Sequence, residues 1–471
     1  MRVLKFGGSS LADGERIKAV TTIVASAAEA ERLAVVLSAM KGVTDLLISA
    51  ARKAEEGPDG FRPILDRIRS QHVDAVRYLF AAADQSAALT PIALLCNELE
   101  EILHGVELIR ECSPRTLDLI MSFGERLSCD LASAYFRTQG LAAETVDARE
   151  IVLTDDRFGS AAVDFPGSYA RIEKRLTAVP GIPVVPGFIG ATDRGVTTTL
   201  GRNGSDYTAS IIGAGVGARE IEIWTDVDGV LSADPRLVPE AFVIPTISYE
   251  EAMELSYFGA KVIHPYTMVP AVEKDVPLLI KNSLNPAAPG TRIVAGAVMR
   301  REGGRPVTGI ASIEGISLVN IEGGGMMGIP GFAARTFAAL AKAGINIIMI
   351  SQASSEHTIC LVFRTGEGEK ALAALNQELA FELSTRRIER FELLSDLVVV
   401  SAIGENMHGT PGIAGRVFSA LGREGINILV IAQGSSERNI SFVVQKKDHL
   451  SALRTIHAEF LSGARRASAS A

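Results

Sequence analysis

The feature that most constrains the fold is an internal repeat in the C-terminal part of the chain. The Pro-Gly pair at Pro330 recurs at Pro411, an offset of 411 − 330 = 81 residues, and the other matches keep this offset without a gap. The other recurring positions are Arg335, Phe337, Leu340, Gly344-Ile345-Asn346-Ile347, Gln352 and Ser354-Ser355-Glu356. A repeat of fixed period indicates one structural unit built twice. Each copy is expected to form a strand, a loop, a helix, two strands joined by a turn and a final helix, which predicts two small α+β modules.

The first 295 residues follow a different pattern, in which short apolar runs alternate with helical patterns. The apolar runs expected to form strands are Val3–Phe6, Leu33–Ser38, Ile182–Pro186 and Ile221–Thr225. Strands alternating with helices predict an α/β domain with a largely parallel sheet. Residues 50–121 lack such runs and are expected to form a helical insertion. Residues 186–202 are expected to form a hairpin, with Asp193-Arg194-Gly195 as its turn.

Residues that break regular structure separate these two regions. Prolines and glycines interrupt the pattern at Asn285–Gly290 and again at Gly303–Pro306. We therefore predict one domain over residues 1–296 and a second region over 297–471. Within the second region the two modules are expected at about 315–391 and 395–464, either in succession or interleaved.

Composition excludes several classes of protein. The chain has 47 Lys and Arg against 55 Asp and Glu, a formal net charge of −8, which argues against a nucleic-acid-binding protein with a broad basic face. Runs of 18 apolar residues are absent, so we expect no membrane span. The four cysteines show no C-x-x-C spacing, which predicts neither a disulfide framework nor a bound metal. Scattered thiols suit a reducing cytosol, and the N-terminus does not look like a signal peptide, so a cytoplasmic location is expected.

A glycine-rich segment after the first expected strand is a candidate phosphate site. Lys5-Phe6-Gly7-Gly8-Ser9-Ser10 precedes an expected helix, whose N-terminus would favour an anion. Glycines let backbone N–H groups approach phosphate oxygens, and Lys5 adds a positive charge. The structural alternative is a tight turn with an incidental surface lysine. The segment does not match the Walker-type phosphate loop.

Two further polar segments have both a functional and a structural interpretation. Gly201-Arg202-Asn203-Gly204-Ser205-Asp206 places a cation, a hydroxyl and a carboxylate before a helix expected to start near Tyr207. Alternatively, Ser205 or Asp206 caps that helix. Ser122-Phe123-Gly124-Glu125 has the spacing of a capping box, which by itself favours a structural role for Glu125.

Other motifs are weaker or absent. Gly323–Gly328 fits a dinucleotide-binding pattern, but the second copy of the repeat does not keep the three glycines, so we do not expect a dinucleotide there. The sequence shows no Ser/His/Asp or Cys/His set for nucleophilic catalysis. An acceptor that is already an ionised carboxylate needs no base. Positioning and charge neutralisation then suffice, as in phosphoryl transfer.

Taken together, the motifs resemble those of the aspartokinase family. The matching segments are Lys5–Ser10, Ser122–Arg126, Thr199–Tyr207, Trp224–Val230 and Phe258–Pro265, in order and at suitable spacing, and the tandem repeat resembles paired ACT domains. The resemblance implies an open sheet of the amino-acid-kinase type sandwiched by helices, followed by two α+β ACT modules. It also implies ATP- and Mg²⁺-dependent conversion of L-aspartate to L-4-aspartyl phosphate, the first step toward lysine, threonine and methionine.

The resemblance also implies roles for individual residues. Lys5 and Asp206 would be catalytic, and the aspartate-binding residues would be Ser38, Thr44, Glu125, Arg202 and Ser205. The nucleotide would be held by Lys5, Phe6, Gly7, Gly8, Thr225, Asp226, Arg236 and Lys261. Arg202 would grip the α-carboxylate of aspartate, and Glu125 would face its ammonium. A tyrosine often found near the adenine in the family is Leu231 here.

For the ACT region the resemblance implies feedback inhibition by an end-product amino acid. The candidate effectors are lysine, threonine or both. The candidate ligands of the effector are Asn346, Gln352, Asn427 and Gln433, with the Met326–Gly331 loop closing over the site. The structural alternative is that these repeated polar residues cap strands and turns. The family usually assembles through its ACT domains, so a homodimer or homotetramer is expected.

Two rival functions remain open. One is an amino-acid kinase of the same fold that acts on glutamate or acetylglutamate. The other is an amino-acid sensor with an inactive kinase-like domain. Some members of the family continue into a homoserine dehydrogenase domain, and since this sequence ends after the second ACT module, that activity is expected to be absent.

Overall fold

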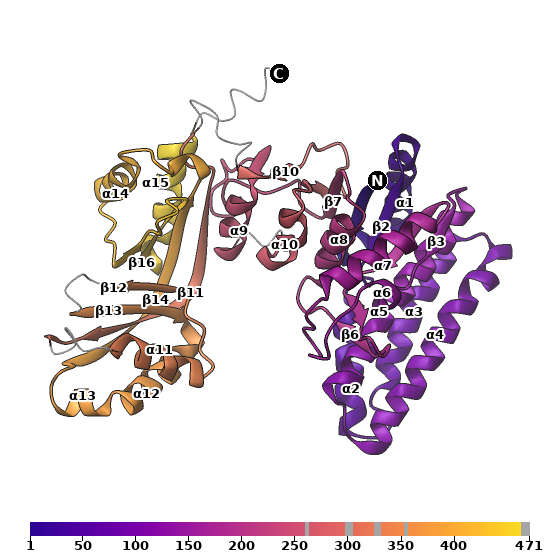
Figure 1. The fold of residues 1–471 in the computed structure, drawn as a ribbon, viewed down its shortest axis with the longest axis horizontal. Helices are drawn as coiled ribbons and strands as arrows, with labels where there is room; N and C mark the ends of the chain where they lie inside the picture. The colour runs from indigo at the N-terminus through magenta and orange to yellow at the C-terminus, as the bar shows by residue number, and fades with distance from the viewer. Residues whose placement is uncertain (260–262, 297–304, 325–330, 353–356, 463–471) are drawn as a thin grey trace. The chain divides into compact units, whose positions relative to one another are not determined.

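The chain forms two compact units in the computed structural model, which describes residues 1–259, 263–296, 305–324, 331–352 and 357–462 (Figure 1). The first unit comprises Met1–Val230, Val243–Tyr249 and Val262–Val298. The second comprises Leu231–Phe242, Glu250–Lys261 and Met299–Ala471. The predicted boundary at residue 296 is next to residues 297–304, which lie outside the described part of the chain. Within the described ranges, none of the helices has the length and apolar character needed to cross a bilayer.

The first unit is built on an eight-stranded sheet with the order β3-β4-β2-β1-β7-β9-β10-β8. Its strands are β1 Arg2–Phe6, β2 Leu33–Leu37, β3 Ala143–Thr145, β4 Ile182–Pro186, β7 Glu220–Thr225, β8 Thr246–Ser248, β9 Leu278–Asn282 and β10 Thr291–Val294. All neighbours are parallel except β9 and β10, as the alternating pattern predicts. Because the chain leaves the central β1 for β2 on one side and later for β7 on the other, the strands' carboxyl ends leave a crevice there.

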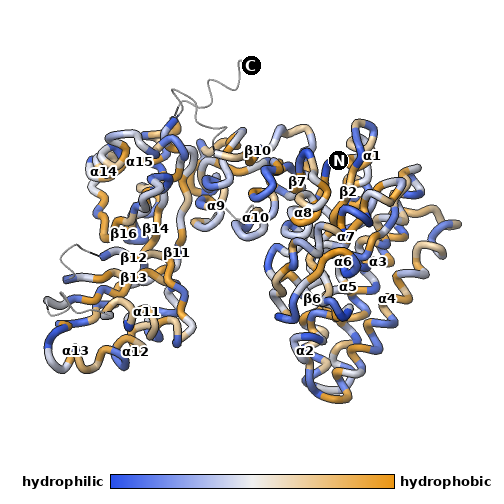
Figure 2. The backbone as a smooth tube through the Cα atoms, in the orientation of Figure 1, coloured by the Kyte–Doolittle hydropathy of each residue, from blue (hydrophilic) through white to orange (hydrophobic). Residues whose placement is uncertain are grey.

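Four long helices form the predicted insertion, α2 Val43–Glu56, α3 Arg62–Leu79, α4 Ala82–Ile109 and α5 Pro114–Thr138, and pack side by side (Figure 1). The helical region is longer at both ends than the predicted residues 50–121. Hydrophobic and hydrophilic residues alternate along these helices, and their apolar faces meet in a shared core (Figure 2). The other helices of this unit are α1 Gly14–Ala30, α6 Ala148–Ile151, α7 Phe165–Ala178, α8 Gly204–Gly215 and α10 Pro265–Glu273.

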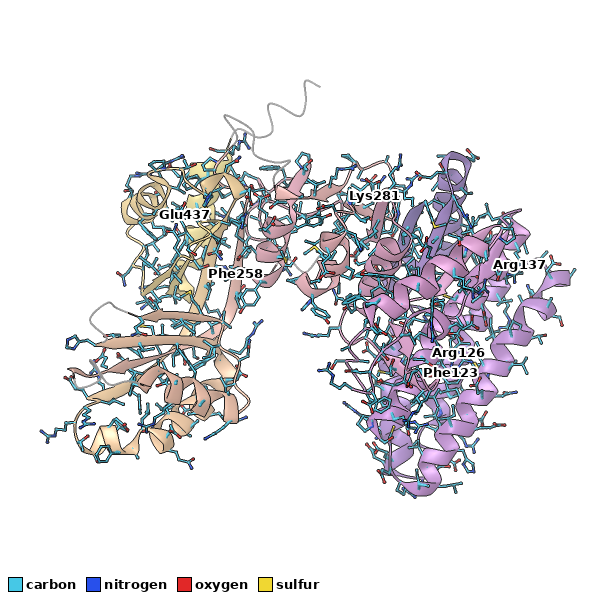
Figure 3. All side chains as sticks on the ribbon, in the orientation of Figure 1. Phe123, Arg126, Arg137, Phe258, Lys281 and Glu437 are labelled. Carbon is cyan, nitrogen blue, oxygen red and sulfur yellow. The ribbon has the colours of Figure 1, made fainter. Side chains whose placement is uncertain are left out.

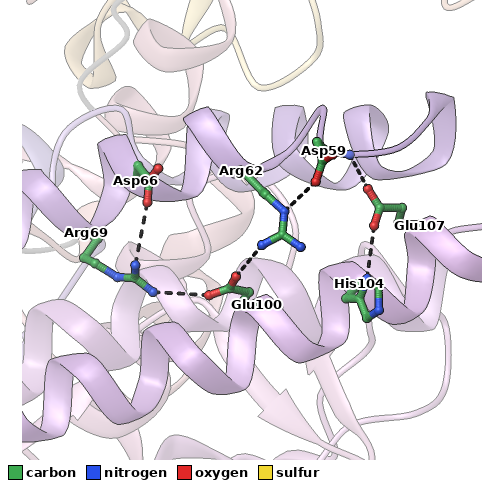
Figure 4. Close-up of polar contacts among 7 residues, drawn as sticks. All are labelled: Asp59, Arg62, Asp66, Arg69, Glu100, His104 and Glu107. Atoms are coloured by element: carbon green, nitrogen blue, oxygen red, sulfur yellow. Dashed lines mark hydrogen bonds and ion pairs between the residues drawn. The ribbon is translucent and has the colours of Figure 1, made fainter.

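Ion pairs link the exposed sides of this bundle. Arg62 bridges Asp59 and Glu100 at 2.7 and 2.9 Å, and Arg69 contacts Glu100 at 3.4 Å (Figure 4). Such exposed pairs contribute about 1 kcal/mol or less each. The buried apolar faces therefore contribute most of the stability of the bundle.

The second unit contains a six-stranded antiparallel sheet with the order β12-β13-β11-β14-β16-β15. The first copy of the repeat forms β11 Gly309–Glu322, α11 Phe332–Lys342, β12 Met349–Gln352, β13 Thr358–Arg364, α12 Gly368–Glu378 and α13 Ala380–Ser384. The second copy forms β14 Arg390–Ile403, α14 Ile413–Arg423, β15 Val430–Ala432, β16 Asn439–Gln445 and α15 His449–Leu461. Helix α9 Tyr249–Tyr257 begins directly after Ser248. The predicted order of elements is therefore present in both copies.

Candidate active site

The glycine-rich segment after β1 forms a tight connection at the carboxyl edge of the sheet. The Gly7 N–H donates to the Trp224 carbonyl at 3.3 Å, and a short 3₁₀ turn follows over Gly8–Leu11. A Cβ atom on Gly8 would lie 3.1 Å from the Ala39 carbonyl oxygen, and one on Gly7 would lie 3.3 Å from Lys5 Nζ. Glycine at these two positions therefore keeps the loop close to both the lysine and the end of β2.

Lys5 is buried at the end of β1 and forms an ion pair with Asp206. The Lys5 Nζ lies 2.6 Å from Asp206 Oδ1, and each side chain is 9% exposed. A buried pair between residues 201 positions apart does not fit an incidental surface lysine. The ammonium is held at the point where the strands of the sheet present their carboxyl ends.

Asp206 lies in the first turn of α8, which corrects the predicted start near Tyr207. The helix begins at Gly204, and Asn203 takes the N-cap position with a φ of 55° and no side-chain capping bond. Asn tolerates this left-handed conformation, so the helix starts before Ser205. The capping interpretation of Ser205 and Asp206 is therefore wrong, and the Asp206 carboxylate faces Lys5 instead.

Glu125 lies in the middle of α5 and not at a helix start, so the predicted capping box is wrong. The helix is capped by Ser113, whose hydroxyl accepts from the Thr116 N–H at 3.2 Å, while the Ser122 hydroxyl donates to the Leu119 carbonyl. Ser-x-x-Glu spacing also occurs inside a helix, where the serine bonds back to the preceding turn. The local pattern alone cannot distinguish these two positions.

The Glu125 carboxyl is buried beside Lys5 and lacks one partner. Burial raises the pKa of this carboxyl to about 8, while a backbone hydrogen bond from Ala39 and the charge of Lys5 act in the opposite direction. Its Oε2 atom has no hydrogen-bond partner in the described part of the chain. Buried polar atoms in folded proteins are normally paired, so this oxygen marks a place for an incoming donor.

Arg126 directly follows Glu125, but its side chain contacts other residues of the helix bundle. Its guanidinium lies 4.5 Å from the centre of the Phe123 ring (Figure 3). It also pairs with Glu98 of α4 at 3.0 Å. These contacts make Arg126 a structural residue of the bundle.

Arg202 follows the predicted hairpin, which forms with β5 Ile189–Ala191 and β6 Thr197–Thr199. Gly195 in its turn has a φ of 76°, as the turn prediction requires. Gly201 also has a positive φ, of 77°, and Arg202 is exposed. Among the residues that the structure describes, Arg202 has no hydrogen bond or ion pair, so its guanidinium is available to a ligand.

The remaining aspartate-binding candidates lie on loops and helix ends at the same edge. The Ser38 N–H donates to the Phe6 carbonyl at 3.1 Å directly after β2, and Thr44 is half-buried in the first turn of α2. Ser205 is 7% exposed, and a Cβ on Gly187 after β4 would lie 2.7 Å from its Cβ. Ser38 thus lies where the ends of β1 and β2 meet, and Ser205 lies where the start of α8 meets the end of β4.

The candidate nucleotide-binding residues lie in different parts of the chain. Thr225 ends β7 and donates to the exposed Asp226 at 3.2 Å. Arg236 belongs to the second unit, where its guanidinium pairs with Asp234 at 2.6 Å. Lys261 lies outside the described residues.

Sequence reasoning missed Asn282 and Ser283, at the end of β9. The Ser283 and Ser10 hydroxyls are 2.7 Å apart, and the Ser283 N–H donates to the Thr225 carbonyl at 2.8 Å. The Asn282 amide donates to Asp228 at 2.9 Å. These bonds tie β9 to both candidate ligand loops. The signal was a polar pair one residue after the apolar run that ends at Ile280, next to the residues interpreted as a boundary.

The four effector candidates are exposed in the second unit, at Asn346, Gln352, Asn427 and Gln433. Gln433 lines a hollow of about 310 Å³ beneath the Gly409–Gly412 loop, together with Glu437. The Glu437 carboxylate accepts from the Gly409 N–H at 2.6 Å and so holds this loop in place. In the first copy, residues 325–330 of the corresponding loop lie outside the described residues.

Comparison with known proteins identifies both regions. The amino acid kinase family matches residues 1–282, and the ACT domain matches residues 319–379 and 400–460. Aspartokinase 1, chloroplastic, of Arabidopsis thaliana is 36% identical over 97% of this chain and 80% of its own length. Bifunctional aspartokinase/homoserine dehydrogenase 1, chloroplastic, of the same plant is 38% identical over 97% of this chain and 51% of its own length. The chain thus spans about half the length of the bifunctional relatives that it matches.

Two solved structures of aspartokinase III from E. coli are similar along almost the whole chain. The complex with aspartate and ADP is 31% identical, with a TM-score of 0.78 over 98% of this chain and 99% of the other. The complex with lysine and aspartate is 32% identical, with a TM-score of 0.80 over 98% and 100%.

Proposed function

We infer, because the chain belongs to the aspartokinases within the amino acid kinase family, that it phosphorylates the side-chain carboxylate of L-aspartate with ATP. The product would be L-4-aspartyl phosphate, the first intermediate toward lysine, threonine and methionine. The observation that carries this proposal is the buried Glu125 carboxyl with an unpartnered oxygen next to the Lys5–Asp206 pair. A substrate ammonium would supply the missing donor, and a substrate with a carboxylate at each end would also engage Arg202 and Lys5.

In this mechanism the protein positions groups and neutralises charge. The aspartate side chain is ionised at neutral pH, so it attacks without a general base. Arg202 would hold the α-carboxylate through its planar fork, and Glu125 would hold the ammonium. The Lys5 ammonium, fixed by Asp206, would stabilise the charge on the transferring phosphoryl group together with the backbone N–H groups of Gly7 and Gly8.

ATP and Mg²⁺ are the proposed co-substrate and cofactor, supported by the ADP in the similar E. coli structure. Mg²⁺, when bound, would neutralise charge on the nucleotide phosphates, and its protein ligands are usually one or two carboxylates. The exposed carboxylate of Asp226 at the end of β7 fits this requirement. Thr225, Asp226, Arg236 and Lys261 remain the proposed nucleotide contacts.

We also propose feedback through the ACT modules. The similar E. coli structure binds lysine, and the hollow beside Gln433 offers polar groups to an amino acid. Lysine or threonine, or both, would bind at Asn346, Gln352, Asn427 and Gln433. The proposed assembly is a homodimer or homotetramer through the ACT modules, and the proposed location is the cytoplasm, where the four free thiols would stay reduced.

The test is a hydroxamate assay with ATP, Mg²⁺ and either aspartate, glutamate or acetylglutamate. We expect product with aspartate. The K5A variant should lose about 100- to 1,000-fold in kcat, because groups that stabilise charge in the transition state contribute on that order. The K18A variant is the control, since Lys18 is exposed on α1. Product with glutamate or acetylglutamate alone would favour the related kinases. Absence of turnover with every substrate would favour the inactive sensor.

A further inference from the structure

Asp118 is a buried carboxylate that the proposed mechanism does not use. It lies in the N-terminal part of α5, and its side chain is fully buried. Both carboxylate oxygens accept from the Gly159 N–H at 3.0 Å, and Oδ2 accepts from the Thr199 N–H at 2.9 Å. Oδ1 also accepts from the Thr199 hydroxyl at 2.8 Å. The Asp118 carboxylate therefore links the segments around Gly159 and Thr199 to α5 by hydrogen bonds.

Both segments border the loop that carries Arg202. Thr199 is the last residue of β6, three positions before Arg202. The Thr199 carbonyl accepts from the Ala161 N–H at 2.9 Å, which joins the Gly159 segment to the same strand end. A Cβ on Gly201 would lie 3.3 Å from the Gly159 carbonyl oxygen, so the two segments are in close contact just before Arg202.

The same helix carries Glu125. Asp118 and Glu125 are seven residues apart, which is two helical turns, so they share a face of α5 about 10.5 Å apart along its axis. Glu125 would bind the ammonium of the substrate, and Asp118 anchors the strand end before the residue that would bind its α-carboxylate. Helix α5 thus carries both the residue that would bind the substrate ammonium and the residue that anchors the strand end before Arg202.

We propose that Asp118 is a positioning residue, which sets the place of Arg202 relative to Glu125 and so determines affinity for the α-amino-acid end of the substrate. The inference rests on the proposed function, because it takes Arg202 as the carboxylate ligand. Asp118 acts only through the Thr199 and Gly159 segments, so its loss should weaken substrate binding without removing a group from the reacting atoms.

The test compares two adjacent buried threonines. T199V removes the hydroxyl that donates to Asp118, whereas T198V removes one that pairs with Thr154 at 2.7 Å. We expect T199V to raise the KM for aspartate several-fold and D118N to raise it at least ~10-fold, because small displacements of a positioning group have effects of this order. Values of kcat and of the KM for ATP should stay within about threefold of wild type. T199S keeps a hydroxyl at position 199 and should have the wild-type KM for aspartate. T198V leaves the Thr199 hydroxyl in place and should also have the wild-type KM.

A double-mutant comparison separates positioning from general destabilisation. If Asp118 acts through Arg202, D118N should add nothing to the aspartate KM of R202A. Amide hydrogen exchange at Gly159 and Thr199 should be faster in D118N. Equal KM values for T199V and T198V, or additive effects of D118N and R202A, would overturn the inference while leaving the proposed function intact. A wild-type enzyme that does not phosphorylate aspartate, or an unchanged aspartate KM in R202A, would overturn both.

Discussion

At the scale of single residues, the site is defined by charges that the fold removes from water. Lys5 and Asp206 form an ion pair, whereas Glu125 Oε2 has neither an ion pair nor a hydrogen bond within the described residues. Burying a charged group without a partner is costly, and here it shifts the protonation of Glu125. The expected consequence is a site that is incomplete until a cation binds.

The raised pKa of Glu125 predicts a pH-dependent stability. Its pKa is about 8 in the folded protein against an ordinary value of 4.5. Between these values the folded protein keeps a proton that the unfolded chain has released, so the free energy of unfolding should fall as the pH rises through this window. E125Q lacks this titration and should be more stable than wild type above pH 8, by roughly 2–5 kcal/mol, with no such excess below pH 4.5. Urea unfolding at pH 4.5, 6, 8 and 9 measures the difference, and a constant difference would contradict the assignment.

The same titration should appear in substrate binding. The ionised form of Glu125 attracts the substrate ammonium, so kcat/KM for aspartate should rise with pH through about 8 in wild type. E125Q should lose this rise and bind aspartate at least ~10-fold more weakly, because a charged hydrogen bond becomes a neutral one. An E125Q profile with the wild-type rise would assign the titration to another group.

At the scale of elements, α5 needs a close approach to the loop after β2. A Cβ on Gly124 would lie 2.9 Å from the Ala39 Cβ and 3.3 Å from Leu47 Cδ1. G124A should therefore push the helix away and raise the aspartate KM, although alanine is the better helix former by about 1 kcal/mol. Gly105 in α4 is the matched control, because a Cβ there would meet nothing within 4 Å. G105A should stabilise the protein in thermal unfolding at unchanged KM. The prediction fails if the two variants behave alike.

The two copies of the repeat show how well the local sequence pattern predicts the bounds of helices and strands. The 81-residue offset is reproduced by the bounds of β11 and β14, of α11 and α14, and of β13 and β16. Periodicity and turn residues act within a few positions, so the shared pattern of the two copies forms similar elements. The predictions from local pattern that proved wrong concern the first residues of helices. The pattern predicted starts near Tyr207 and Ser122, and both positions lie inside helices.

At the scale of the whole molecule, regulation requires an effector to bind one catalytic state better than another. The hollow beside Gln433 is a candidate site for such a ligand. Q433A should raise the lysine or threonine concentration for half-inhibition by about 2–10-fold without changing uninhibited kcat, because one side-chain hydrogen bond contributes about 0.5–1.5 kcal/mol. Q445A at the exposed end of β16 is the control. Unchanged inhibition in Q433A would remove this hollow from the effector site.

The sequence by itself determined the fold class, the two-part organisation, the repeat, the main strands and the family. Each of these follows from periodicity, spacing and the order of motifs, which are local or countable along the chain. The tertiary structure alone decided the burial of Glu125, the Lys5–Asp206 pair, the contacts of Asn282 and Ser283 with the candidate ligand loops, and the hydrogen bonds of Asp118. These properties depend on which side chains from distant segments exclude water or donate hydrogen bonds, and such neighbours are set only when the chain has packed.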